Sequence, residues 1–413
     1  MQLDGALPVK RPAWAFNLLL ALTMVLVACG PADEGSGSRS GTPGVTNDSI
    51  VLGSSLALTG HAGYLGTQTL QGAEAYLRYI NDHGGVHGRK IRIKAVDDSY
   101  DPPRCLANTQ KFIIDNDVLA LFSYVGTPTT VKVLPLLEEA HVPLIGMFTG
   151  ANRLREPPNR YVVNIRASYY QETHTAVTNM ITELGIRKIA VFYQYDAYGF
   201  DGLIGTELAL KEYGLEPVAR GSYIRGTLDI TEAVEKISKS GAEAVVMIGT
   251  YGACARFINL ARDEDYNPIF YNVSFVGAEE LARRVGGGNA TVLMSQVVPP
   301  PVDDGTDSAA SQYVQLMNKY FPGESPSFVG LEGFLNARIL VEGLKKAGRK
   351  LTRERLVDAI ESIRNYKLGP GMFITYGKHD RQGLDQVYFT RLQKGRFVPF
   401  TDWKTLEKMR GSH

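Results

Sequence analysis

Two short stretches of the sequence place hydroxyl groups and glycine directly after apolar runs. They are "SYVGTPTT" at residues 123–130 and "MFTGAN" at residues 147–152, with Thr127 and Thr149 near their centres. Thr127 stands where a helix is expected to begin, so unpaired backbone N–H groups and the helix dipole favour an anion there. Gly126 lets the backbone approach a ligand closely. Both stretches therefore suit a small carboxylate, although each threonine would equally fit as an ordinary helix N-cap.

Three further stretches carry aromatic residues next to glycine or a hydroxyl residue. They are "YQYDAYGF" (193–200), "MIGTYGACA" (247–255) and "YNVSFVGAEE" (271–280). Tyrosine offers a flat apolar face and a hydroxyl group, which suits a polar cleft around a small ligand. The alternative for each tyrosine is ordinary packing at the edge of a domain.

Strand and helix patterns alternate from residue 48 onward. Strands are predicted at 49–58, 90–99, 118–124 and 142–148, with helices at 67–85, 102–116 and 128–140 between them. Repeated units of this kind imply an α/β fold with a parallel sheet covered by helices on both faces. Ligands in such sheets bind beyond the carboxyl ends of the strands, where the two threonine stretches fall.

The alternation of strand and helix patterns begins again after residue 173 and predicts a second lobe with the same architecture. Helices are expected at 174–185, 202–214, 228–241 and 252–264, and strands at 188–195, 216–224, 242–250 and 269–275. A helix from about 278 and a strand at 290–298 precede helices at 308–320, 331–347 and 352–363 and two or three terminal strands. The chain is thus expected to cross between the lobes more than once. Two facing strand edges would make a cleft that closes on a ligand.

The bulk composition is that of a globular protein without a nucleic-acid partner. A length of 413 residues favours two domains, and 44% hydrophobic with 21% charged residues is ordinary for a globular chain. The net charge of +1 with no basic block argues against nucleic-acid binding.

The first residues have the character of a targeting segment. Lys10 and Arg11 precede an apolar stretch that ends before Cys29, which favours a signal peptide at 1–28 over a membrane anchor. "LVAC" at its end resembles the lipobox of bacterial lipoproteins, in which the cysteine carries the lipid; the alternative is a plain signal peptide with a chance cysteine. The Gly-, Ser- and Pro-rich stretch that follows predicts a flexible tether over 29–45, which would keep the domain beside a membrane.

Motifs for metal binding, phosphate binding and covalent catalysis are absent from the sequence. Cys105 and Cys254 fall in segments assigned to different lobes and are expected to be free thiols. Glycines between His83 and His87 prevent a shared helical face, so a metal pair is not expected. With no HExxH or GxSxG pattern, neither enzymatic activity nor a cofactor is predicted.

The body of the chain, from about Thr46 to about Phe400, resembles the type I periplasmic binding proteins. Within them it is most similar to the substrate-binding subunits of branched-chain amino-acid ABC transporters. The resemblance rests on the order and spacing of "IVLGSSLALTG", "GAEAYLRYINDHGGVHGRKI", "DDSYDPPR", "SYVGTPTT", "VPLIGMFTGA", "NIRAS" and "YQYDAYG". It implies two Rossmann-like lobes joined by a multi-strand hinge, with 46–166 and 279–370 in the N-terminal lobe and 167–278 and 371–413 in the C-terminal lobe.

The resemblance also implies which residues contact the ligand. The carboxylate site falls on two groups of neighbours, Val125, Gly126 and Thr127 together with Phe148, Thr149 and Gly150. The aromatic contacts fall on Tyr169, Tyr198 and Tyr251, while Tyr64 would cover the mouth of the cleft.

One position departs from the pattern of the family. Amino-acid binders commonly carry an acidic residue at the second crossover to hold the α-ammonium group, and this sequence has Ser274 there, followed by Phe275. A buried ammonium group without a partner is costly. Either Asp196 replaces the missing partner, or the ligand lacks an amine.

Together these features predict an extracytoplasmic, lipid-anchored solute-binding protein of a bacterial ABC importer. It would be a monomer that captures an amino acid or related organic acid and hands it to the permease without covalent chemistry. A sensor lobe of the same fold is the alternative, which a transmembrane or signalling segment beyond the body would favour.

Overall fold

The computed structural model describes residues 41–287 and 290–406. The predicted signal peptide, the lipidation residue Cys29 and most of the predicted tether lie outside the described residues. Within those two ranges, none of the helices combines the length and the apolar character that crossing a bilayer requires.

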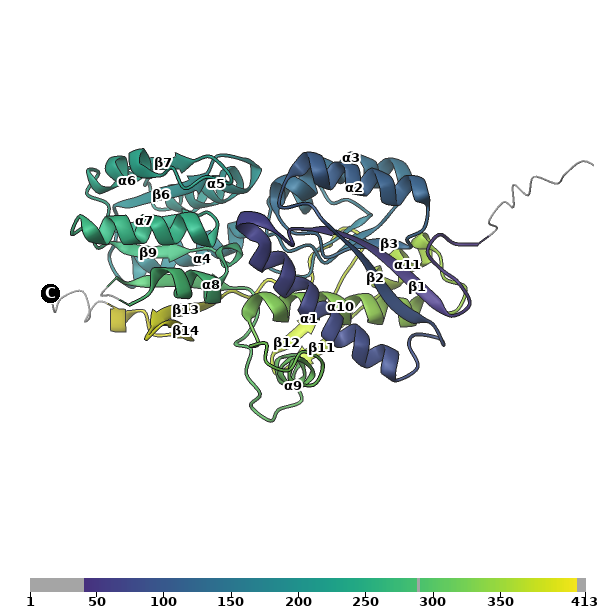
Figure 1. Cartoon of the computed structure of the whole chain (residues 1–413). Helices are drawn as coiled ribbons and strands as arrows, with labels where there is room; N and C mark the ends of the chain where they lie inside the picture. Colours follow the sequence, from purple (N-terminus) through teal and green to yellow (C-terminus); the bar gives the residue numbers. More distant parts are fainter. Residues whose placement is uncertain (1–40, 288–289, 407–413) are drawn as a thin grey trace, which may run out of the picture. The chain divides into compact units, whose positions relative to one another are not determined.

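The first sheet has five parallel strands in the order β2-β1-β3-β4-β5. They are β1 (Ser49–Leu56), β2 (Lys90–Asp97), β3 (Ala120–Phe122), β4 (Leu144–Ile145) and β5 (Val162–Val163). The helices on its two faces (Figure 1) are α1 (Gly63–Asp82), α2 (Pro102–Asp115), α3 (Thr127–Ala140), α10 (Phe328–Ala347) and α11 (Arg353–Glu361), and α9 (Ala309–Tyr320) packs on α1. Strands β1, β3, β4 and β5 are largely buried, as expected for a sheet covered on both sides, whereas the edge strand β2 is mostly half-buried or exposed.

The second sheet has seven strands in the order β14-β13-β10-β9-β8-β6-β7. Its parallel members are β6 (Ile189–Gln194), β7 (Arg220–Tyr223), β8 (Ala244–Ile248), β9 (Ile269–Asn272) and β10 (Val292–Gln296), while β13 (Tyr388–Gln393) and β14 (Arg396–Pro399) are antiparallel additions. The helices of this part are α4 (Tyr169–Thr182), α5 (Ala197–Lys211), α6 (Thr231–Ser238), α7 (Tyr251–Asp263) and α8 (Ala278–Val285) (Figure 1). A separate hairpin pairs β11 (Tyr366–Gly369) with β12 (Met372–Ile374). The predicted α/β class with two Rossmann-like parts is confirmed.

Several boundaries differ from the predicted ones for local reasons. The strands β3 and β4 have three and two residues, shorter than predicted, because Ser123, Gly126 and Gly146 adopt positive φ angles of 52°, 97° and 70° and turn the chain out of the ladder. Helix α4 begins at Tyr169, five residues before the predicted start, because Ser168 and Gln171 form a capping box.

Strand β10 belongs to the second sheet, because it pairs with β9 and β13. This pairing differs from the predicted assignment of residues 279–370 to the first lobe. The cause is that α8 and β10 extend the second sheet by one more strand–helix unit, and local periodicity does not say which sheet a strand joins. The lobe boundaries otherwise remain a prediction.

The chain crosses between the two sheets at residues 164–168, 297–308 and 375–387. Two of these crossings run side by side. The backbone N–H of Asn164 donates to Arg381 O at 2.8 Å, and Leu384 N–H donates to Ile165 O at 2.7 Å. The expectation that the chain crosses more than once is confirmed.

The last residues of the predicted tether are part of the folded domain. The Thr42 hydroxyl donates to Leu351 O at 2.7 Å, and Val51 N–H donates to Gly44 O at 2.7 Å. Gly44 touches the chain so closely that a Cβ atom there would lie 2.3 Å from Leu119 N. The predicted tether boundary at residue 45 is therefore too late.

Helix α10 packs on α1 through backbone contacts that only glycine allows. A Cβ atom at Gly72 would lie 1.8 Å from Gly330 O, and one at Gly333 would lie 2.0 Å from Thr69 O. These contacts join a helix from late in the chain to the first helix.

We predict that Gly72→Ala lowers the free energy of unfolding by about 2 to 3 kcal/mol, because the added methyl group pushes α1 and α10 apart. The matched control is Gly252→Ala in α7, where the nearest atom to a Cβ lies 3.6 Å away. It should change the stability by less than about 1 kcal/mol. Urea unfolding followed by circular dichroism measures both, and equal stabilities of the two variants would contradict the packing described.

Candidate functional site

The two threonine stretches meet at the carboxyl ends of β3 and β4. Gly126 N–H donates to Phe148 O at 3.1 Å, and Phe148 N–H donates to Tyr124 O at 2.8 Å. The hydroxyl groups of Thr127 and Thr149 lie 2.7 Å apart and are buried. The prediction that these strand ends lie together is confirmed.

Neither threonine is the N-cap of a helix. The N-cap of α3 is Gly126, and Thr127 is the first helical residue. Thr149 precedes the N-cap Ala151 of a short 3-10 helix, and its hydroxyl accepts from Ala151 N–H at 3.3 Å. The presence of these two hydroxyl groups is therefore not explained by helix capping. The first N–H groups of α3 lack acceptors within the helix, and the helix dipole favours an anion at this end.

Two glycines of the site make room for tyrosine rings. At Gly126, where φ is +97°, a Cβ atom would lie 2.0 Å from Tyr100 Cε2. At Gly150 it would lie 2.7 Å from Tyr169 Cδ1. Both glycines are required by close contact, and Tyr100 is a site residue that the sequence analysis missed.

The Tyr169 hydroxyl is buried and has no hydrogen-bond partner of normal geometry among the described residues. Burial raises the pKa of Tyr169 above its usual range, and the nearby Arg166 cation and Thr149 hydroxyl oppose this rise. A buried hydroxyl left unpaired costs about 1 to 3 kcal/mol. An oxygen atom of a ligand beside Thr149 would remove that cost.

Five fully buried rings, which we call the aromatic cluster, lie where segments of the two sheets meet. Phe275, in the 3-10 helix after β9, is central: its ring centroid lies 4.6 Å from that of Tyr198, 5.5 Å from Phe148 and 5.8 Å from Tyr100. Tyr169 completes the cluster at 5.3 Å from Tyr198. Tyr100 and Phe148 follow strands of the first sheet, and Tyr198 and Phe275 follow strands of the second. Of the predicted aromatic contacts, the structure thus brings Phe148, Tyr169, Tyr198 and Phe275 together.

Tyr64 and Tyr251 form a separate contact between α1 and α7. Their rings are 6.2 Å apart in an edge-on arrangement. The Tyr64 hydroxyl donates to Glu279 Oε2 at 3.2 Å, and Arg284 stacks over Tyr251 with its Cζ 5.0 Å from the ring centroid. Both tyrosines therefore bridge segments of the two sheets, as a residue at the mouth of a cleft would.

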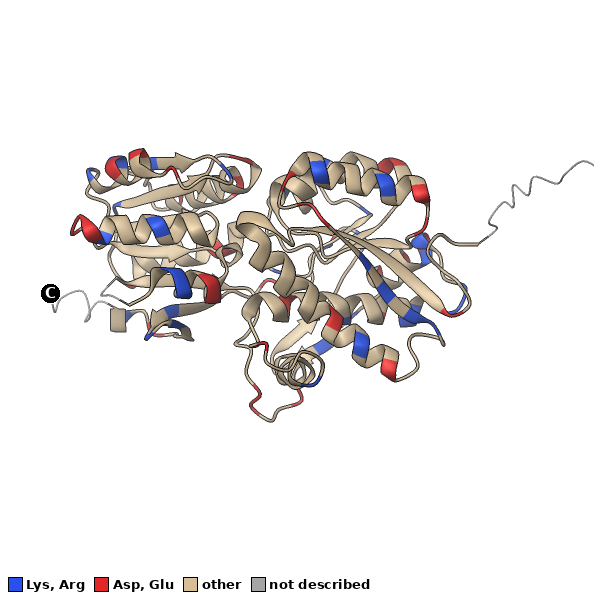
Figure 2. Cartoon of the chain, viewed as in Figure 1, with Lys and Arg blue, Asp and Glu red and all other residues tan. Residues whose placement is uncertain are grey.

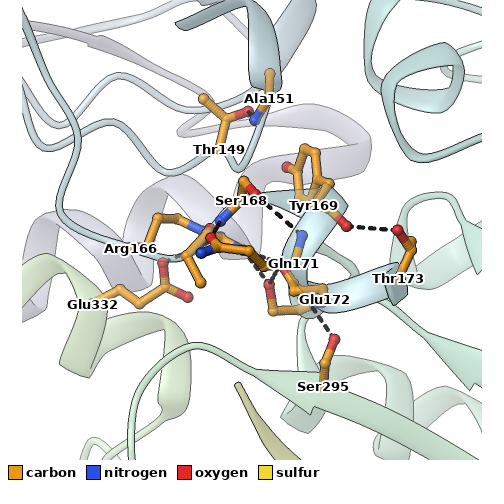
Figure 3. A network of polar contacts seen from close by, with 12 residues as sticks. Thr149, Ala151, Arg166, Ser168, Tyr169, Gln171, Glu172, Thr173, Ser295 and Glu332 are labelled. Carbon is orange, nitrogen blue, oxygen red and sulfur yellow. Dashed lines mark hydrogen bonds and ion pairs between the residues drawn. The ribbon is translucent and has the colours of Figure 1, made fainter. Parts of the chain in front are cut away.

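Ser274 belongs to a buried charged network, and Figure 3 shows its members Arg166, Glu172, Ser295 and Glu332. Arg166 Nη2 donates to Glu172 Oε1 at 2.6 Å, and Arg166 Nη1 donates to Glu332 Oε2 at 3.2 Å. Glu172 also accepts from Ser274 N–H at 2.8 Å, from the Ser274 hydroxyl at 2.9 Å and from the Ser295 hydroxyl. The guanidinium further donates to the Ser274 hydroxyl.

The pKa values of this network follow from burial and pairing. Burial raises the pKa of Glu332 to about 7, although the Arg166 cation opposes the shift. Burial alone would lower the pKa of Arg166, but Glu332 and Glu172 outweigh it and hold that pKa above the usual range. Arg166 therefore stays charged inside the protein.

Asp196 is the N-cap of α5 and is already occupied. Its carboxylate accepts from Tyr198 N–H at 3.0 Å and from Gln194 Nε2 at 2.7 Å, and Arg225 Nη1 lies 3.3 Å away. Burial raises its pKa, and Arg225 opposes the rise. The hypothesis that Asp196 holds a ligand ammonium group is not supported by this arrangement, because the side chain serves the helix and Arg225.

The facing segments are joined by one further polar contact. Asn152 N–H, after β4, donates to both carboxylate oxygens of Asp201 on α5, at 3.0 and 3.1 Å. Burial raises the pKa of Asp201 to about 7, and the Asn152 N–H and Arg155 oppose the shift. A surface cavity of about 480 Å³ lined by Glu207, Lys211 and Arg220, among others, contains none of the predicted ligand residues.

The sequence analysis missed Tyr100, Arg166 and Glu172. Arg166 stands inside the stretch "NIRAS", and Glu172 lies one helical turn after Tyr169. An acidic residue on the apolar face of a helix was the available signal, because such a residue is rarely buried without a partner. Its partners come from crossings far apart in the chain, so no local pattern names them. Cys105 and Cys254 are buried free thiols, as expected.

Comparison with curated proteins finds relatives named as binding proteins. An "Amino acid binding protein" of Pseudomonas aeruginosa is 24% identical over 238 residues, which is 58% of this chain and 64% of that protein. The chain thus spans less than two thirds of the length of this relative. A "Leu/Ile/Val-binding protein homolog 7" of Brucella abortus is 26% identical over 323 residues, covering 72% of this chain and 77% of that protein.

A solved structure has the same fold over most of the chain. It is a possible leucine/isoleucine/valine-binding protein from Rhodopirellula baltica, with 30% identity, a TM-score of 0.80 and coverage of 86% of this chain and 98% of that one. The pattern that defines the periplasmic binding protein family matches residues 49–396. With the strand order, the hinge crossings and this match in agreement, the chain belongs to the periplasmic binding protein family and has its type I fold.

Proposed function

We propose that the protein is an extracytoplasmic solute-binding protein that captures a small carboxylate-bearing ligand between its two sheets and delivers it to an ABC permease. The observation that carries this proposal is the group of buried hydroxyls of Thr127, Thr149 and Tyr169 at the N-terminus of α3. The names of the relatives support it, since they are amino-acid and Leu/Ile/Val-binding proteins.

The ligand carboxylate would lie against the three hydroxyls and the first N–H groups of α3. Hydroxyl groups rotate, so Thr127 and Thr149 can turn from each other and donate to the ligand. The Tyr169 hydroxyl gains a hydrogen-bond partner, which it lacks among the described residues, and the site would need no metal ion or cofactor. The flanking residues Val125 and Gly150 would contribute backbone surface to the same site.

The aromatic cluster and the Asn152–Asp201 contact would close over the ligand. In the structure these groups join segments from the two sheets directly. A ligand that contacts both sheets binds the closed arrangement more tightly than an open one. It therefore stabilises the closed arrangement. The permease would recognise the closed form. A lipid at Cys29 would hold the protein at the membrane, and a sensor of the same fold remains the second candidate.

Titration calorimetry with amino acids and small organic acids tests the capture of a carboxylate. Binding accompanied by a decrease in the radius of gyration in small-angle scattering is the expected result. If no member of the series binds and the scattering does not change, the proposal is wrong.

We predict that Thr127→Val weakens binding of the tightest carboxylate by about tenfold, about 1.4 kcal/mol, because the isosteric side chain removes one donor. The matched control is Thr182→Val on the exposed surface of α4. It should bind as the unchanged protein does. Equal affinities of the two variants would show that the Thr127 hydroxyl does not bind the ligand.

A second prediction concerns the pH dependence of stability. The folded pKa of Asp201 lies near 7, above its unfolded value of 3.8, so the folded state holds the proton more tightly. Stability is then lost as pH rises between these values. Asp201→Asn removes the charge, so its stability relative to the unchanged protein should increase by about 2 to 3 kcal/mol between pH about 5 and about 8.

Thermal unfolding of both proteins across this pH range measures the difference. The exposed Asp229 provides the control variant Asp229→Asn, whose stability relative to the unchanged protein should not vary with pH in this way. A constant difference between Asp201→Asn and the unchanged protein would show that Asp201 is not desolvated.

A further inference from the structure

We propose that the ligand is an apolar monocarboxylate without an ammonium group, and that Ser274 with its buried partners sets this selectivity. The inference rests on the proposed function and specifies its ligand class. It follows from the hydrogen bonds of four acidic side chains near the aromatic cluster, which are Glu172, Asp196, Glu279 and Glu332.

The carboxylate of Glu172 contacts Ser274 directly, and its hydrogen-bond acceptor positions are already filled. It receives hydrogen bonds from Arg166 Nη2, Ser274 N–H, the Ser274 hydroxyl and the Ser295 hydroxyl. An ionised carboxylate has about four acceptor positions, so these donors saturate it. The side chain is also completely buried. An incoming ammonium group would have to displace the guanidinium of Arg166.

Asp196 is occupied in the same manner, and Glu279 has two described donors. Asp196 caps α5 and pairs with Gln194 and Arg225. Glu279 accepts from Phe328 N–H at 2.9 Å and from the Tyr64 hydroxyl at 3.2 Å. Neither offers a free carboxylate to a positively charged ligand group.

Glu332 has one described partner, Arg166 Nη1 at 3.2 Å. In Figure 3 its carboxylate lies on the side of Arg166 away from Thr149. Glu332 is already paired with that cation, so an ammonium group that binds Glu332 must approach the guanidinium of Arg166. Because like charges repel strongly where water is excluded, this approach is unfavourable.

Cationic groups instead border the aromatic cluster. Arg166 Cζ lies 5.5 Å from the ring centroid of Phe148 and 5.4 Å from that of Tyr169. Arg225 Cζ lies 5.9 Å from the ring centroid of Tyr100. The surroundings of the three hydroxyls thus combine hydrogen-bond donors, guanidinium groups and aromatic faces. They suit a carboxylate with an apolar body, and rings approaching within 4.6 to 5.8 Å favour a flat one.

Matched ligand pairs test this inference on the purified protein without any mutation. The pairs are 3-phenylpropanoate with L-phenylalanine, and 4-methylpentanoate with L-leucine, which differ only in the α-amino group. Titration calorimetry should show the deaminated acid binding at least about tenfold tighter in the pair that fits best. The alcohol 3-phenylpropanol should bind more weakly than 3-phenylpropanoate, because it lacks the carboxylate.

The outcomes separate this inference from the proposed function. If an amino acid binds as tightly as its deaminated partner or tighter, the inference is overturned while carboxylate capture stands. If neither deaminated acid binds, the inference is also overturned. If no acid of the wider series of amino and organic acids binds either, the proposed function is also wrong.

A pair of variants tests the assignment to position 274. Ser274→Asp adds a carboxylate at the crossover, and Ser274→Asn adds nearly the same volume without charge. The ratio of L-phenylalanine affinity to 3-phenylpropanoate affinity should be about tenfold higher in the Asp variant than in the Asn variant. Circular dichroism establishes that both are folded. Equal ratios in the two folded variants would overturn the role of Ser274.

Discussion

The buried ion pair between Arg166 and Glu172 is the interaction on which the rest of the site depends. The side chains are 4% and 0% exposed, and their N–O distance is 2.6 Å. Burying two charges costs several kcal/mol per ion, which only close pairing and further hydrogen bonds offset. Arg166 stands in the crossing between the sheets and Glu172 on α4, so the pair also fixes the crossing to the second sheet. Removing one partner would leave an uncompensated charge in the interior.

This pairing decides which polar groups remain for a ligand. The acceptors of Glu172 and Asp196 are filled, whereas the hydroxyl of Tyr169 has no hydrogen-bond partner of normal geometry among the described residues. The hydroxyls of Thr127 and Thr149 are bonded to one another. Hydroxyl groups that can turn to donate to a ligand, beside the filled carboxylates of Glu172 and Asp196, favour an anion. The same network that stabilises the crossing thus gives the site its preference for a carboxylate, and position 274 carries a donor instead of an acid.

The closed arrangement of the aromatic cluster has a consequence for affinity. Phe275 contacts rings from both sheets, and such aromatic pairs contribute about 0.5 to 1.5 kcal/mol each beyond their buried area. The site must open for a ligand to enter, so these contacts are lost and then replaced by contacts with the ligand. A ligand with a flat apolar body replaces them better than a fully polar one.

The sequence by itself determined the alternation of strands and helices, the two-part α/β fold and the meeting of Thr127 with Thr149. These features follow from local periodicity and from the rule that parallel strands end at one edge of a sheet. Only the tertiary structure decided that β10 joins the second sheet, that Tyr100 fills the space beside Gly126 and that Glu172 pairs with Arg166. Those contacts join segments distant in sequence, and their energies depend on burial, which no local pattern records.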